Sequence, residues 1–164
     1  MAVTTNALNI TAAGMPLYDG AGNFTPTPYT NSTWTPVLQF GGASVGITYI
    51  TQVASYVRVG NQIFVCINIV LNSKGSSTGN ASITGLPVAC SGTNVEYVLN
   101  GFYVGMSSFP GTTVIPMGRI FPSSSAVDVW AYLGPSAGTI TQLTDANFSS
   151  GTSCTVHLNG SYMV

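Results

Sequence analysis

Short runs of Val, Ile, Thr, Tyr and Phe alternate with turn residues along most of the chain, without the three-to-four spacing of an amphipathic helix. The 19 glycines and nine prolines interrupt these runs repeatedly. Short apolar runs at such spacing are typical of β-sandwiches and barrels. The pattern predicts strands at residues 37–40, 47–59, 62–72, 80–84, 95–104, 113–120, 126–132 and 154–163.

Two connections between these strands have recognisable turn chemistry. Gly60 and Asn61 separate the second and third strands, and because both residue types tolerate positive φ, they predict a tight turn. Residues 141–148 predict one helical or 3₁₀ turn with Thr144 as its cap.

The first 30 residues differ in character from the rest. They contain few large apolar side chains, and Pro26 and Pro28 stiffen the exit into the first core strand. Such a segment cannot form its own core, so we expect it to order against another surface. We therefore predict an all-β chain: an extended N-terminal arm at residues 1–30, followed by an antiparallel, jelly-roll-like β-sandwich at residues 31–164.

The small number of charged residues excludes several classes of function. Only 4% of the residues are charged, three Lys+Arg and four Asp+Glu, against roughly 25% in an ordinary soluble domain. Three cations cannot neutralise enough phosphates for nucleic-acid or anionic-membrane binding. The best candidate for a membrane span, residues 62–71, has only ten residues and contains Asn68, so we expect no membrane insertion. No basic segment precedes an apolar core at Met1, so we expect no signal peptide.

The cysteines offer little chemistry. The chain has three cysteines, Cys66, Cys90 and Cys154. Their odd number and wide spacing argue against a disulfide framework and against a zinc site. Cys66 and Cys154 lie in apolar runs and are expected to be buried. A nucleophilic pair of Cys90 or Cys154 with His157 would need a lowered thiol pKa, and few cations are present to lower it.

Catalytic motifs are equally scarce. The carboxylates of Asp19, Glu96, Asp128 and Asp145 are isolated in the sequence and are expected to be solvated or structural. Two of them would have to meet within roughly 5 to 10 Å to form a glycosidase pair, which the sequence leaves open. We therefore expect no enzyme, no cofactor and no metal.

Aromatic residues are abundant in a chain with so little charge. Flat rings together with Asn, Ser and Thr are the groups that bind neutral glycans. Three stretches depart from strand patterning, at residues 105–111, 121–125 and 133–138, and we expect them to converge at one end of the sandwich. The predicted glycan-binding or receptor-binding residues are Tyr103, Phe109, Phe121, Trp130 and Tyr132.

Several segments from residue 31 onward resemble a known family. They are TWTPVLQFGGASVGITY at 33–49, YVRVGN at 56–61, SKGSSTG at 73–79, ITGLP at 83–87, LTDANF at 143–148 and LNGSY at 158–162. Together they resemble a module of the tail fibres and tailspikes of tailed bacteriophages. The resemblance implies a trimeric β-sandwich at the distal end of a virion fibre, often used to bind the host surface, and it carries no catalytic motif.

Two main functions are expected from these features. The first is a virion structural protein, assembled in the cytoplasm of the bacterial host, whose homotrimer binds host-surface polysaccharide and whose residues 1–30 dock on other tail, baseplate or capsid proteins. The alternative is a capsid decoration or head-fibre protein docked by the same arm. A polysaccharide-cleaving enzyme is the third and least favoured function.

Overall fold

A computed structural model describes residues 14–18, 24–92, 94–107, 114–134, 139–149 and 154–164. For residues 14–18 and 24–28 it describes the main chain alone. Most of the described residues lie in β-strands, which confirms the all-β prediction. The elements are β1 (Gly14–Tyr18), β2 (Phe24–Trp34), β3 (Val37–Phe40), β4 (Ile47–Val59), β5 (Gln62–Lys74), β6 (Ala81–Thr84), β7 (Tyr97–Val104), β8 (Ile115–Ile120), β9 (Ala126–Tyr132), β10 (Ile140–Gln142), the 3₁₀ turn η1 (Asp145–Asn147) and β11 (Cys154–Met163).

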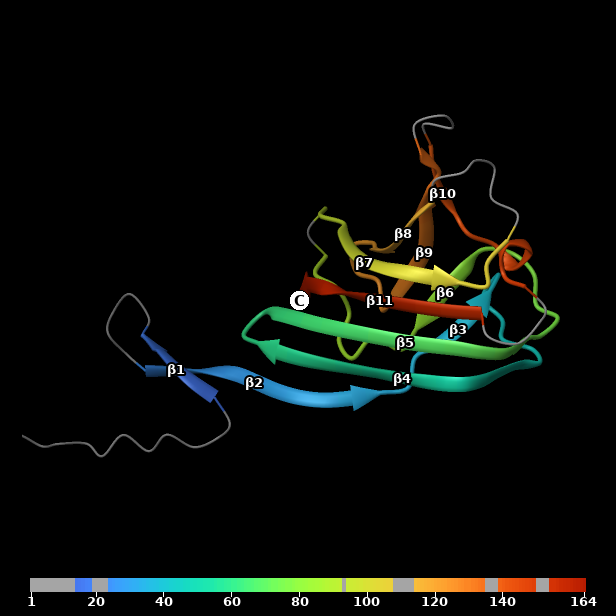
Figure 1. Cartoon of the computed structure of the whole chain (residues 1–164). Coiled ribbons are helices and arrows are strands. Elements are labelled where there is room, and N and C mark those ends of the chain that lie inside the picture. Colours follow the sequence, from blue (N-terminus) through green and yellow to red (C-terminus); the bar gives the residue numbers. More distant parts are fainter. Residues whose placement is uncertain (1–13, 19–23, 93, 108–113, 135–138, 150–153) are drawn as a thin grey trace, which may run out of the picture.

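The strands belong to one antiparallel sheet that curls over on itself. Its order is β1-β2-β4-β5-β11-β7-β8-β9-β6-β3, with β10 paired to β9. In Figure 1, β4, β5, β11 and β7 form one layer, and β8, β9, β6 and β3 fold behind it. The two layers are therefore continuous through the β7–β8 pairing, rather than being separate sheets.

A single core lies between the two layers. Alternate residues of β5 face inward, as do alternate residues of β9 and β11. Because side chains of a strand point to opposite faces in turn, each of these strands presents one apolar row to the core. The inward rows are Ile63, Val65, Ile67, Ile69 and Leu71 on β5, Val127, Val129 and Ala131 on β9, and Cys154, Val156 and Leu158 on β11. No helix within the described ranges is long and apolar enough to cross a membrane.

Strands β1 and β2 were not predicted from the sequence. The main chain of residues 14–18 pairs with residues 24–28 in a hairpin, and residues 29–34 pair with β4 from Tyr29↔Val59 to Trp34↔Ala54. In Figure 1 the hairpin extends beyond the two layers. The part of β2 that holds Pro26 and Pro28 pairs with β1 alone, where a missing N–H is tolerated. The anchoring role of residues 1–30 and the homotrimer stay predictions.

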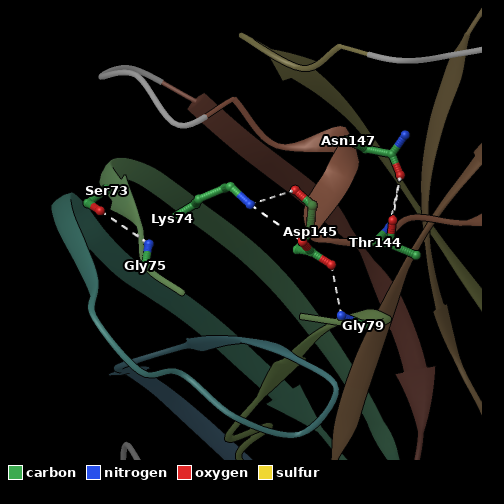
Figure 2. Close-up of polar contacts among 7 residues, drawn as sticks. All are labelled: Ser73, Lys74, Gly75, Gly79, Thr144, Asp145 and Asn147. Atoms are coloured by element: carbon green, nitrogen blue, oxygen red, sulfur yellow. Dashed lines mark hydrogen bonds and ion pairs between the residues drawn. The ribbon is translucent and has the colours of Figure 1, made fainter. Parts of the chain in front are cut away.

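One polar corner ties the turn η1 to the loop between β5 and β6 (Figure 2). The Gly79 N–H donates to Asp145 Oδ1 at 2.8 Å, and Lys74 Nζ lies 3.5 Å from Asp145 Oδ2. Thr144 occupies the N-cap position of the turn, as predicted, and its main-chain N–H donates to Asn147 Oδ1 at 2.9 Å. The corner holds two loops that are far apart in the sequence, so Asp145 is a structural carboxylate.

Acid should weaken this corner. The Gly79 N–H and the Lys74 ammonium hold the pKa of Asp145 below its ordinary value, so ionised Asp145 favours the folded state. That contribution is present above the unfolded pKa, near pH 4, and is lost as the pH falls through the lower folded pKa. We expect Asp145→Asn to lower stability at neutral pH and to remove this acid-sensitive component, as measured by urea unfolding at several pH values.

Asp128→Asn is the contrasting variant, because it removes a carboxylate whose pKa is shifted in the opposite direction to that of Asp145. Burial raises the pKa of Asp128 despite the nearby Arg119, so the ionised form of Asp128 disfavours folding. The contribution of the Asp128 carboxyl to stability is largest below its unfolded pKa and is lost as the pH rises through its higher folded pKa. Equal pH profiles for the two variants would contradict the assigned roles.

Candidate functional site

Charged and aromatic side chains gather on the outward face of β8 and β9. The two strands pair with Ile115 opposite Tyr132, Met117 opposite Trp130 and Arg119 opposite Asp128. The intervening residues Gly118, Ile120, Val127, Val129 and Ala131 are buried. The alternation of the strands therefore directs the paired residues away from the core.

Arg119 is the centre of this face. Its guanidinium carbon lies 4.4 Å from the centroid of the Trp130 ring and 4.9 Å from that of Phe121. Its Nη2 forms an ion pair with Glu96, which directly precedes β7, the strand that pairs with β8. The Arg119 side chain is only 17% exposed, whereas that of Glu96 is 43% exposed. Arg119 is thus held between two rings and a carboxylate. We call Glu96, Arg119, Phe121, Asp128 and Trp130 the arginine patch.

The charge of the arginine patch is small and negative. Glu96 and Asp128 contribute −2 and Arg119 contributes +1, so the sum is −1 when all three are ionised. Burial raises the pKa of Asp128, and the Arg119 guanidinium partly offsets that rise. Three of the seven charged residues of the chain meet here, among rings that offer flat apolar surface. The patch therefore suits a neutral ligand with several hydroxyls better than an anionic one.

The structure brings some of the predicted glycan-binding residues together. Phe121 and Trp130 meet through Arg119, and Tyr132 follows Trp130 on the same face of β9. The hydroxyl of Tyr103 donates to the main-chain oxygens of Met117 at 2.9 Å and Trp130 at 3.1 Å. Tyr103 thus braces β8 and β9, and its burial raises the pKa of the phenol. Phe109 lies outside the described residues. Ligand contact by any of the five stays a prediction.

The three loops do not converge as expected. Because β7, β8 and β9 are antiparallel neighbours, the end of β7 and the end of β9 lie at one end of the sheet, where residues 105–111 and 133–138 begin. The segment 121–125 joins β8 to β9 at the opposite end. There the Cys90 N–H donates to the Ser124 oxygen at 2.8 Å. The expected loop cluster is therefore wrong, and the arginine patch lies on the strands.

The prediction for Cys66 is also wrong. Cys90 and Cys154 are buried, and burial raises the pKa of Cys154 to about 11. Cys66 instead lies exposed on the outward face of β5, because both faces of this strand are apolar in sequence and the run alone does not show which is covered. Neither buried thiol contacts His157. It is Cys66 Sγ that lies 3.8 Å from His157 Nε2.

Comparisons with known proteins add one observation. No protein-family model matches the chain, and no curated protein matches it. Among solved structures, the Dettilon tailspike protein (gp208) is similar, with a TM-score of 0.65 and 19% identity over 82% of this chain. The same fold occurs in a phage tailspike. At this identity the likeness concerns the fold, and the chain covers 24% of the tailspike chain.

Sequence reasoning missed Arg119 and underrated Glu96. The two lie 23 residues apart, and only the pairing of β7 with β8 brings them together. One signal was available in the sequence. Arg119 is one of only three cations, and it stands between Gly118 and Ile120 within an apolar strand. A cation in such a position needs a partner, since burying it alone would be costly.

Proposed function

We propose that the chain is a bacteriophage virion structural protein, a module like those of tail fibres and tailspikes, that binds neutral saccharide of the host cell surface through the arginine patch. Two observations support this proposal. The fold is similar to part of a phage tailspike. The patch also concentrates rings, carboxylates and a guanidinium in a chain that otherwise has few charges.

The groups of the patch match the chemistry of a sugar. The C–H face of a pyranose packs against an aromatic ring, while its hydroxyls exchange hydrogen bonds with carboxylates and a guanidinium. Glu96 uses one carboxylate oxygen in its ion pair with Arg119. The remaining oxygen lone pairs of Glu96 and Asp128 can accept hydrogen bonds from sugar hydroxyls. One such site is weak, and repeated copies on a virion would raise the overall affinity through avidity.

The single observation that carries the proposal is the contact of Phe121 and Trp130 with Arg119, and Phe121→Ala tests it. Loss of one stacking ring worth about 1 kcal/mol should weaken each contact about fivefold. We therefore expect clearly reduced adsorption of the purified chain to host cells and to their extracted polysaccharide. The melting temperature should change little, because Phe121 is partly exposed at the end of a strand.

Phe64→Ala is the matched control. Phe64 is 46% exposed on β5, away from the arginine patch, so its removal should leave adsorption unchanged. If Phe121→Ala adsorbs as well as the parent, the patch is not the binding site. Labelled protein found on the head of the virion rather than the tail would favour a capsid decoration protein instead.

A further inference from the structure

The outward face of the other layer contains a cysteine and a histidine in contact. Cys66 lies on β5 opposite Asn159, and His157 lies on β11 opposite Asn68, so the two are diagonal neighbours across one ladder. Diagonal side chains on one face of a sheet are within reach of each other when one of them is long. Here Cys66 Sγ and His157 Nε2 are separated by 3.8 Å. Cys66 is exposed and His157 partly so, which leaves the pair accessible from solvent.

A third side chain orients the imidazole. Phe102 on β7 is the direct partner of His157 on the other side of β11. The two rings stack at 5.0 Å between centroids, with an angle of 8° between their planes. The stack restrains the plane of the imidazole on the β7 side, while Nε2 lies near the Cys66 sulfur on the β5 side. The pair is therefore arranged before any ligand arrives.

The separation of the two atoms matches the geometry of a metal ion. Zinc lies about 2.3 Å from a cysteine sulfur and about 2.0 Å from a histidine nitrogen, which places the two ligand atoms of a tetrahedral ion roughly 3.5 Å apart. The observed 3.8 Å is close to this span and corresponds to a slightly wider angle at the metal. Thiolate and imidazole are ligands of zinc and softer ions, whereas magnesium and calcium require oxygen.

We propose that Cys66 and His157 bind a borderline or soft divalent cation of the Zn²⁺ class, with Phe102 positioning the imidazole. Cys66 releases its thiol proton to solvent when the ion binds, and the remaining coordination positions face water. No group of three or more His, Cys, Asp or Glu suitable for a metal occurs within the described ranges. The site is thus an open one with two protein ligands, weaker than a closed structural zinc site. It is independent of saccharide binding at the arginine patch.

Titration of the reduced, full-length chain with Co²⁺ tests this proposal, because a thiolate bound to cobalt gives a charge-transfer absorption band. We expect the band in the parent, its displacement by Zn²⁺ and its loss in Cys66→Ser. His157→Gln should weaken the apparent affinity for Co²⁺ more than about tenfold, since it removes a ligand. Asn100→Ala, on the same face of β7, should bind Co²⁺ as the parent does. A band that persists in Cys66→Ser, or an unchanged affinity in His157→Gln, would overturn the proposal.

The positioning role of Phe102 has its own measurement. Phe102→Ala leaves both ligand atoms in the chain, so the charge-transfer band should remain while the affinity for Co²⁺ falls. The loss should be smaller than that of His157→Gln. Melting temperatures without metal identify any variant whose fold has changed, and equal affinity in a folded Phe102→Ala would show that the ring plays no part.

Discussion

Replacing Phe148 with alanine should lower the free energy of unfolding by about 3–5 kcal/mol, the usual result for removing a large aromatic side chain from a packed core. Phe148 is 2% exposed, and its ring meets that of Phe40 edge-on, with centroids 4.9 Å apart. It directly follows η1, so the ring also anchors the corner formed by Lys74, Gly79 and Asp145 to the core. Removal would open a cavity beneath β3.

Denaturant unfolding followed by tryptophan fluorescence gives the loss of stability, and a fall in melting temperature on the order of 10 °C should accompany it. Phe64→Ala removes the same side chain from an exposed position and should stay within about 0.5 kcal/mol of the parent. Similar losses in the two variants would mean that Phe148 does not carry the packing assigned to it.

Gly101→Ala should also be strongly destabilising, for a different reason. Gly101 pairs with Leu158 where β7 meets β11, and a Cβ at this position would overlap the main-chain oxygen of His157. A side chain can rotate away from such an overlap, but the main chain of a central strand cannot. The methyl group must therefore separate β7 from β11, and we expect a loss of at least about 3 kcal/mol, at the upper end for overpacking.

Gly160→Ala is the matched control for this effect. Its added Cβ would meet mainly the Cδ2 atom of Leu99 at 2.7 Å, the end of a side chain that can shift. We expect a smaller loss of stability in this variant, measured by the same unfolding experiment. If Gly160→Ala is the more damaging of the two, the close approach of β7 to β11 is not what requires glycine at position 101.

Local patterning was sufficient to predict most of the strands. Strands β3, β4, β9 and β11 begin and end at the predicted residues, because alternation and flanking turn residues define them within their own sequence. The same holds for the turn capped by Thr144. Strand β2 escaped prediction because its prolines and polar residues do not resemble a strand, and it is held by pairing with β1 and β4. β10 has only three residues, too few to show a pattern.

The candidate sites depend on the register between paired strands, which the sequence does not show. Composition indicated that aromatic residues would be available for a ligand, but nothing local indicated that Phe121 and Trp130 would meet through Arg119. Cys66 and His157 are 91 positions apart in the sequence. Shifting β11 by one residue against β5 would move His157 to the core face and abolish the pair.

The central place of β11 has a consequence for biosynthesis. It is the latest of the described strands in chain order, yet it lies between β5 and β7 and closes the first layer. While the ribosome is still making the preceding residues, β5 has β4 on one side and an unpaired edge on the other. An unpaired apolar edge of this kind readily joins another nascent chain. The sheet can be completed only after residue 163 has left the ribosome, so the edge of β5 stays open to aggregation and to chaperones from the emergence of β5 until that of β11.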